Sequence, residues 1–249
     1  MIDVAFTGAQ ARPAARAVVI DVLRATSTIT LALASGYERV LVAGGVDQAR
    51  ELRAEGRVLA GEVECERPPG FDLGNSPEET LTPRGPELIL STTNGAPAIL
   101  AAAASCDEVL VASLLNLDAI VATLAESSLD VLLLCAGTNG AMTLEDVYLA
   151  GRISAALEGD RTDAARIAEA LAASFQKPLD ALDASAGSVG LYAAGLASDI
   201  AFCAQESITS MVPQLARTIG DVAILEARSQ TAGVPAQHAA STASEHADS

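Results

Sequence analysis

The segment Val19–Thr28 brings together residue types that can hold a phosphate group. Asp21 ends an apolar run, and Arg24 follows three residues later. Thr26 and Ser27 then open a helical stretch. A carboxylate can ligate a metal ion, a guanidinium can bind two phosphate oxygens at once, and hydroxyls beside a helix start add donors. A hydroxyl cap on the helix and a surface ion pair between Asp21 and Arg24 would explain the same residues without any chemistry.

A second group of small polar residues follows another apolar run and precedes an Ala-rich helical pattern. It contains Thr92, Thr93, Asn94 and Gly95, with Pro97 in the first turn of the helix, where proline is tolerated. An Asn-Gly turn flanked by hydroxyls can form an anion-binding nest. In isolation, a plain helix N-cap explains this segment better.

A third group begins where the apolar run 129–135 ends. Gly137 and Thr138 form a turn, and Glu145 and Asp146 lie in the first turn of the next helical pattern. Acidic side chains at this place favour the helix dipole even when they have no catalytic duty. They are also oxygen donors of the kind that Mg²⁺ prefers.

Residues 61–86 are rich in Gly, Pro and acidic side chains and predict a long excursion over the surface. Long ordered excursions are more often functional than idle. Glu62 continues a buried strand pattern toward the same sheet edge as Asp21, which makes it a candidate ligand. Asp72 is a second candidate, although it or Asn75 could simply close a turn.

Several classes of phosphate chemistry are excluded by single residues. Lys177 is the only lysine, so no GxxxxGK[ST] phosphate loop is present. Leu23 stands where an aspartyl-phosphate phosphatase of the DxDxT type needs its second aspartate. Ala141 stands where a Cx5R phosphatase needs its arginine, so Cys135 is interpreted as a small core residue.

Both histidines, His238 and His246, lie in the segment 229–249, which has one large aliphatic residue and no periodicity. We expect this segment to be a disordered tail, because it cannot bury enough surface to offset its ordering entropy. The body of the chain then has no histidine, which excludes Ser-His-Asp hydrolysis, phosphohistidine chemistry and His-ligated zinc. Deletion of the tail is expected to leave the reaction rate unchanged.

Strand-like and helical patterns alternate through the first 160 residues. The expected strands are Ala17–Val22, Arg39–Val42, Val58–Ala60, Glu87–Leu90, Glu108–Val111 and Leu129–Cys135. The expected helices between them are Thr28–Ser35, Val46–Glu55, Ala96–Ala104 and Leu117–Ser127. Residues 143–228 are expected to be mainly helical, with a last strand at Val222–Leu225.

Continuously apolar strands that alternate with helices predict a three-layer α/β/α fold with a mostly parallel sheet. A mixed sheet, with some antiparallel strands, is the open alternative. Residues 1–228 are expected to form a single catalytic domain, with two lobes as an open alternative. In such a sheet, ligands bind where strands end and helices begin. The three groups of polar residues are therefore expected to meet at one edge.

The chain of 249 residues has 15 basic and 32 acidic side chains, a net charge of −17, with no Trp and few other aromatic residues. Such a surface repels nucleic acid and offers few rings on which bases stack. No apolar run approaches the ~18 residues of a membrane span, and the four cysteines form no CxxC pair. We expect a cytoplasmic protein without nucleic acid or membrane partners. Assembly into a homo-oligomer is an open alternative.

Four collinear motifs, VVIDVLRATST, GFDLGNSP, STTNGAPA and CAGTNGAMTLEDVYLAG, together with the later GLASDIAFCAQ and MVP, resemble the 2-phosphosulfolactate phosphatase (ComB-like) family. The resemblance runs in order over roughly residues 1–225. It implies Mg²⁺-dependent hydrolysis of (R)-2-phospho-3-sulfolactate to 3-sulfolactate and phosphate, a step of coenzyme M biosynthesis.

The resemblance and the local patterns together give three sets of expected site residues. The catalytic set is Asp21, Arg24 and Glu62. The set for substrate and phosphate binding is Arg24, Thr26, Ser27, Thr92, Thr93, Asn94, Gly95, Gly137 and Thr138. The set for metal binding is Asp21, Glu62, Asp72, Glu145 and Asp146.

The expected substrate is a small anionic phosphoester. Because the protein is itself strongly acidic, a divalent cation and Arg24 must supply the local positive field. Oxygen ligands without histidine favour Mg²⁺ over zinc. Two alternatives are a phosphatase or phosphotransferase for another acidic phosphoester, and a non-catalytic relative that keeps the anion pocket.

Overall fold

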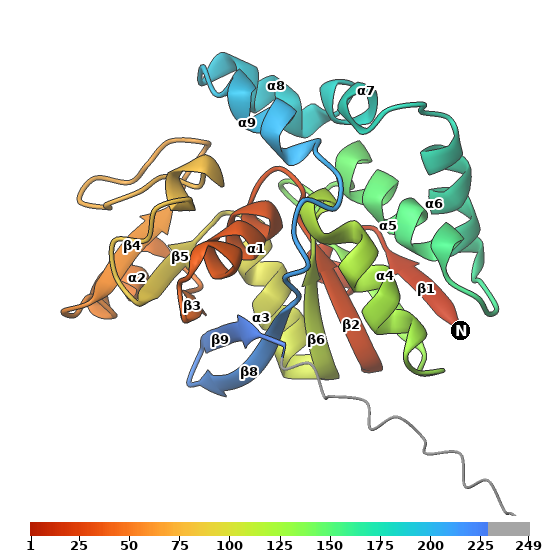
Figure 1. Ribbon diagram of the computed structural model, residues 1–249, viewed down its shortest axis with the longest axis horizontal. Coiled ribbons are helices and arrows are strands. Elements are labelled where there is room, and N and C mark those ends of the chain that lie inside the picture. The colour runs from red at the N-terminus through yellow and green to blue at the C-terminus, as the bar shows by residue number, and fades with distance from the viewer. Residues whose placement is uncertain (229–249) are drawn as a thin grey trace, which may run out of the picture.

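The structure is a computed structural model that describes residues 1–228 (Figure 1). The predicted tail, 229–249, lies outside these residues. The strands are β1 (Ile2–Ala5), β2 (Ala14–Ile20), β3 (Arg39–Val42), β4 (Arg57–Gly61), β5 (Glu87–Ser91), β6 (Cys106–Ala112), β7 (Val131–Cys135), β8 (Pro213–Ile219) and β9 (Val222–Ala227). The α-helices are α1 (Ala25–Ser35), α2 (Val46–Glu51), α3 (Gly95–Ser105), α4 (Leu117–Ala125), α5 (Leu144–Ala156), α6 (Asp163–Ala173), α7 (Pro178–Asp183), α8 (Ala186–Ala193) and α9 (Ala197–Cys203).

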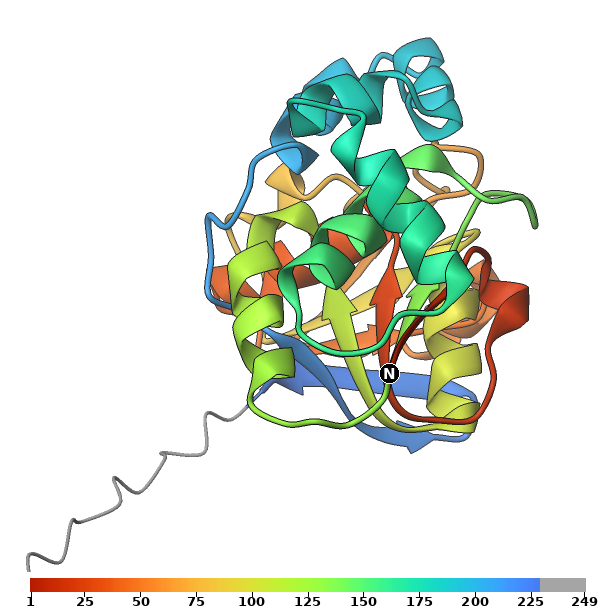
Figure 2. The ribbon, with the colours of Figure 1, turned by 90° about the vertical axis from the view of Figure 1, so that its right-hand side faces the viewer.

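The strands form one sheet in the order β1-β7-β2-β6-β8-β9-β3-β5-β4. Two groups of parallel strands, β1-β7-β2-β6 and β3-β5-β4, are joined by the antiparallel hairpin β8–β9. Figures 1 and 2 show this hairpin in blue at the lower end of the molecule, where it crosses the direction of the strands in the first group. The predicted class, a mostly parallel and partly mixed sheet covered by helices, is confirmed.

Alternating residues of the first group face two different cores, as a period of two requires. Val18 and Ile20 face a core that includes α4, α5 and α6, whereas Ala17 and Val19 face a core with α1 and α3. This second core also contains side chains of β3, β4, β5 and β9. The helices α1 and α3 therefore lie between the two strand groups (Figure 1).

The position of α1 explains its composition. Nine of its eleven residues are buried, and they carry no charge and alternate between small, hydroxyl and aliphatic side chains. A helix that is apolar all round is one that is covered all round. Its N-terminus follows β2 directly and its axis is fixed by both strand groups, so the β2–α1 junction is held rigidly.

Two strands were not predicted from the sequence, β1 and β8. β1 has four residues, and Asp3 interrupts its apolar character. β8 begins at Pro213, and its second half is exposed, so it lacks the apolar run of a central strand. The prediction of a mainly helical segment after residue 143 holds for α5 to α9, and the predicted strand at Val222–Leu225 is β9.

The excursion 61–86 contains no strand and folds along the end of β4, where Gly61 N–H donates to the Gly74 carbonyl and Asp72 N–H to the Leu59 carbonyl. Within residues 1–228, no helix is both long and apolar enough to cross a membrane.

Candidate active site

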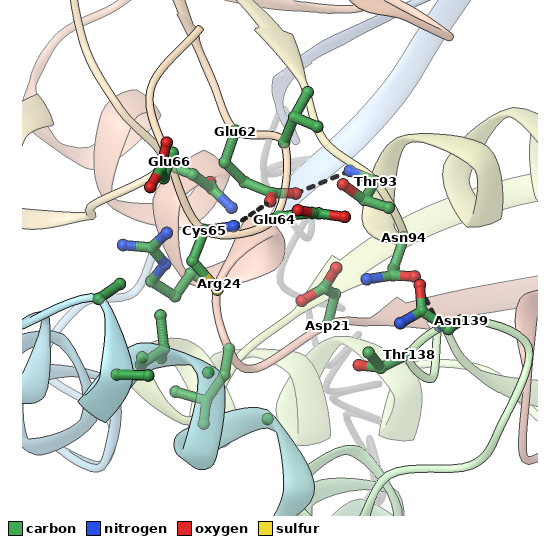
Figure 3. A pocket seen from close by; sticks show the side chains of 18 of the residues that line it. Asp21, Arg24, Glu62, Glu64, Cys65, Glu66, Thr93, Asn94, Thr138 and Asn139 are labelled. Atoms are coloured by element: carbon green, nitrogen blue, oxygen red, sulfur yellow. Dashed lines mark hydrogen bonds between the residues drawn. The ribbon is translucent and has the colours of Figure 1, made fainter.

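A cavity of about 720 Å³ opens where β2, β4, β5 and β7 end (Figure 3). One wall comes from the three predicted junctions and the excursion, and the opposite wall comes from small residues of α8. The predicted site residues that line it are Asp21, Arg24, Glu62, Thr93, Asn94 and Thr138. The crossing of the β8–β9 hairpin brings the ends of β4 and β5 to the end of β2, although the sheet direction reverses between the two groups.

The β2–α1 junction is closed by its own hydroxyls. Thr26 Oγ1 donates to the Asp21 carbonyl at 2.8 Å and accepts from Asp21 N–H at 3.1 Å. Ser27 Oγ donates to the Val22 carbonyl at 2.9 Å. Both hydroxyls are buried and neither lines the cavity. The structure gives them a role in shaping the turn in place of the predicted contact with phosphate.

The second junction lies directly against the first. An added Cβ at Gly95 would come within 2.5 Å of Asp21 Oδ2, so only glycine lets α3 begin beside this carboxylate. Thr92 Oγ1 accepts from Ala96 N–H, in the first turn of α3, at 3.0 Å and lies outside the cavity. Thr93 and Asn94, in contrast, line the cavity as predicted.

The third junction is tied to the other two by hydrogen bonds. Asp146 Oδ1 accepts from Val22 N–H at 2.9 Å, and its Oδ2 accepts from Gly137 N–H at 3.0 Å. Asn94 Oδ1 accepts from Asn139 N–H at 3.0 Å, the bond drawn at the right of Figure 3. Asp146 and Gly137 thus support the cavity from behind, and the neighbouring turn lines it through Thr138 and Asn139.

Three buried acids lie close together at the cavity: Asp21 lines it, and Glu145 and Asp146 lie behind. Burial raises the pKa of Asp21 well above its ordinary value, and the charges of Asp146 and Glu145 raise it further. Burial also raises the pKa of Glu145 and of Asp146. Glu145 Oε2 is buried and has no hydrogen-bond partner among the described residues. A cation or bound protons would relieve this repulsion.

Glu62 is held in place by two backbone amides. Its Oε2 accepts from Cys65 N–H at 3.0 Å and its Oε1 from Thr93 N–H at 2.7 Å, as the dashed lines in Figure 3 show. These bonds join the excursion to the second junction. Glu62 lines the cavity together with Glu64 and Glu66.

Asp72 lies elsewhere. Its Oδ2 accepts from Leu59 N–H at 2.8 Å and pairs with Arg53 at 3.3 Å, and it does not line the cavity. The structure therefore does not bring this predicted metal ligand to the other acids. Its turn directs the carboxylate back onto β4 and toward α2.

Arg24 lines the cavity and has a partner that the sequence analysis did not assign. Its Nη1 donates to Asp199 Oδ2, and Asp199 Oδ1 accepts from Ser76 Oγ at 2.7 Å. Asp199 lies in the first turn of α9, and this position in GLASDIAF is the only signal of its role in the sequence. Asn75 and Asn139 are further lining residues that were not predicted.

Residues 6–218 match the protein family described as 2-phosphosulpholactate phosphatase. The chain belongs to this family. The matched range contains the three junctions, the excursion, α8 and Asp199, so the whole cavity lies within the part that is shared with the 2-phosphosulfolactate phosphatase family.

Individual relatives give the same result. A protein of Thermus thermophilus named probable 2-phosphosulfolactate phosphatase is 39% identical over 215 residues, 84% of this chain and 91% of the relative. One of Thermotoga maritima with the same name is 39% identical over 219 residues, 86% and 95% of the two chains. The protein of Methanothermobacter thermautotrophicus named 2-phosphosulfolactate phosphatase is 36% identical over 197 residues, which are 79% of this chain and 84% of the relative.

Among residues 1–228, no three His, Cys, Asp or Glu side chains converge as a ready-made metal site. Mg²⁺ commonly keeps several waters and binds through one or two carboxylates plus phosphate oxygens of the substrate. Asp21 faces the cavity, and the unpartnered Glu145 Oε2 adds uncompensated negative charge behind it. The donor set therefore fits a Mg²⁺ ion that is completed by substrate and water, and not a closed site made of protein ligands alone.

Proposed function

We propose that this chain is a Mg²⁺-dependent phosphatase that hydrolyses (R)-2-phospho-3-sulfolactate to 3-sulfolactate and inorganic phosphate. The observation that carries the proposal is the position of Asp21, a buried carboxylate that faces a cavity built from four strand ends and backed by two further acids. Membership in the 2-phosphosulfolactate phosphatase family supports the substrate. The assignment to coenzyme M biosynthesis rests on the resemblance alone.

The charge of the cavity explains the need for a divalent cation. Its lining includes Asp21, Glu62, Glu64 and Glu66, and Arg24 is the only basic side chain among the described residues that line it. The substrate carries a phosphate, a carboxylate and a sulfonate. One guanidinium cannot offset these charges together with four carboxylates, so a Mg²⁺ ion is needed to bring the phosphate to Asp21.

The resident ion would be held by Asp21, with Glu145 and Asp146 as the neighbouring acids whose charges it offsets. When bound, Mg²⁺ supplies positive charge to the oxygens of the phosphoryl group. Glu62 keeps the rim of the cavity in place, because its two oxygens join the amides of Cys65 and Thr93.

Two helix N-termini provide further stabilisation. α1 begins after Arg24 and α3 begins at Gly95, and the residues directly before both helices line the cavity. Their aligned peptide dipoles favour an anion at this place. Hydrolysis breaks the bond between phosphorus and the ester oxygen and transfers a water oxygen to phosphorus. The guanidinium of Arg24 favours the transition state, in which charge spreads over the equatorial oxygens.

Release of inorganic phosphate tests the proposal. The purified full chain is incubated with 2-phosphosulfolactate in Mg²⁺, in excess chelator, and in chelator followed by restored Mg²⁺. We expect turnover that chelator abolishes and Mg²⁺ restores. 2-Phospholactate, phosphoglycolate and 4-nitrophenyl phosphate serve as comparison substrates. A higher kcat/KM for any of these would move the function to another phosphoester, and binding of all four without phosphate release would indicate a non-catalytic relative.

A further inference from the structure

A smaller cavity of about 260 Å³ adjoins the active-site cavity, between the excursion and the start of α9. The two cavities share Arg24, Cys65 and Asn75 in their linings. A ligand in contact with Arg24 therefore borders both spaces. The smaller cavity is completed by Arg67, Ser76 and other residues of the excursion, and by Leu196.

The lining of the smaller cavity is less acidic than that of the larger one. Arg24 and Arg67 line it, and Glu79 is its one acidic side chain among the described residues. Arg24 is already paired with Asp199, so Arg67 is the basic side chain that matters here. Glu79 Oε2 is already bonded to Gly74 N–H. Arg67 is exposed, donates to the Asp72 carbonyl at 3.3 Å, and forms no ion pair with any residue in 1–228. A positive charge without a carboxylate partner is thus available at this cavity.

Asn75 adds a second and independent feature. It is 4% exposed, lines both cavities, and its side-chain amide makes no hydrogen bond to any described residue. Buried amides are nearly always hydrogen-bonded, because the loss of their contacts with water costs free energy. The buried atom without a partner is Asn75 Oδ1. The two ends of an amide have nearly the same shape, so turning the amide over places its N–H₂ group there as a donor for an oxygen atom bound between Arg24 and Arg67.

We propose that the smaller cavity is the subsite for the sulfonate of the substrate, with Arg67 and Asn75 as its specificity-determining residues. The inference rests on the proposed function. In 2-phospho-3-sulfolactate the sulfonate oxygens lie one bond farther from the phosphate-bearing carbon than the carboxylate oxygens. The sulfonate is therefore the group that extends past Arg24 when the phosphate is at Asp21. Its three oxygens are acceptors only, which matches a cavity that offers guanidinium and amide donors.

Substrate discrimination tests this assignment. We compare kcat/KM of the Mg²⁺-loaded wild type and Arg67→Gln for 2-phosphosulfolactate and for 2-phospholactate, which lacks only the sulfonate. Arg67→Gln is expected to lower kcat/KM for the sulfonated compound by about 10- to 100-fold through KM, as for the loss of one charge-assisted hydrogen bond. Activity toward 2-phospholactate should stay unchanged.

Arg84→Gln is the matched control. Arg84 is also exposed and its Nη1 also points to the Asp72 carbonyl, at 3.5 Å, but it lines neither cavity. It should leave both substrates unaffected. An equal loss on both substrates in Arg67→Gln, or no loss on either, would overturn the sulfonate subsite.

A binding experiment separates this proposal from the proposed function. Calorimetric titration of the wild type and Arg67→Gln with 3-sulfolactate and with lactate needs no turnover. If the wild type binds 3-sulfolactate and Arg67→Gln weakens this binding at least about 10-fold, the subsite holds even if no phosphate is released from any compound. Binding that Arg67→Gln leaves unchanged, or no binding to the wild type, contradicts the subsite whatever the activity.

Discussion

Arg24 and Asp199, 175 positions apart in the chain, form a buried ion pair with 2.5 Å between Nη1 and Oδ2. Their side chains are 3% and 2% exposed. Because Asp199 also accepts from Ser76, the pair joins the β2–α1 junction to α9 and to the excursion. The guanidinium is thereby fixed at the boundary between the two cavities, and its Nη1 bond to Asp199 is its only side-chain hydrogen bond to residues 1–228. Arg24 is not in a surface pair, which was the alternative offered by the sequence.

The first prediction concerns the geometry of this guanidinium. Arg24→Lys keeps the charge but loses the planar fork of the guanidinium. The variant should therefore lose about 2–4 kcal/mol of transition-state stabilisation, measured as a lower kcat/KM for a phosphoester. Arg16→Lys is the control, because Arg16 is also buried and also pairs with an acid, Glu108 at 2.5 Å, at the opposite end of β2. Both variants should lower Tm, but only Arg24→Lys should slow catalysis. An unchanged kcat/KM in Arg24→Lys would remove Arg24 from the site.

The second prediction separates Asp21 and Asp72, which the sequence analysis placed in the same metal-binding set. Asp21→Asn should lower kcat at saturating Mg²⁺ by about 10²-fold or more, since it removes a charged component of the site. Stability should be retained, because the raised pKa of Asp21 shows that its charge is unfavourable in the fold. Asp72→Asn should keep its activity, because Asp72 lies outside the cavity. Near-normal turnover in Asp21→Asn would contradict its assignment to the metal.

The third prediction tests the close approach of α3 to Asp21. Gly95→Ser adds a Cβ that would collide with Asp21 Oδ2 and with the Cβ of Ala25, so α3 must shift. We expect a loss of stability of about 1–3 kcal/mol, as for overpacking, together with reduced kcat. Gly45→Ser is the control, because nothing lies within 4 Å of an added Cβ there and serine suits the N-cap of α2. Equal Tm values for the two variants would show that α3 moves freely.

The fourth prediction is a pH dependence of the metal-free protein. Burial, with the charge of Asp146, raises the pKa of Glu145 to about 8, and burial raises that of Asp146 to about 6. A folded-state pKa above the unfolded value contributes stability that is lost as pH rises through it. The free energy of unfolding in urea should therefore fall as pH rises from the ordinary carboxyl pKa values of 3.8 and 4.5, first through both groups up to about pH 6 and then through Glu145 alone up to about pH 8.

Two comparisons make this pH prediction specific. Added Mg²⁺ should reduce the fall in stability, because the ion favours the ionised carboxylates. Glu145→Gln should reduce it at the upper end of the pH range, because the variant has no proton to lose at that position. Stability that rises with pH in the metal-free wild type would mean that the buried acids do not repel one another.

The sequence was sufficient to predict that the three junctions meet, as they do at one cavity, but not which of their atoms face it. Apolar runs mark β2, β5 and β7, and polar residues at their ends were correctly placed at one cavity. The hydroxyl of Ser27 has the same chemistry in the sequence as that of Thr93. Only the fold shows that a backbone carbonyl takes up the former.

Contacts between residues far apart in the chain could be predicted even less. The partnership of Arg24 with Asp199 depends on how α9 packs over the sheet, and no local pattern encodes that packing. β8 was not predicted for a similar reason. Its place in the sheet is set by pairing with β6 and β9, and its own residues have little apolar character.

The β8–β9 hairpin has a consequence for the synthesis of the protein. It is the last element of the described residues, and within the sheet it alone connects the strand group that precedes Asp21 to the one that precedes Glu62. On a ribosome, each parallel group can form early, but the sheet cannot be continuous until about residue 227 has emerged. Until then, α1 and α3 are the elements that pack against both groups, and the walls of the cavity take their final positions only when the hairpin joins the sheet.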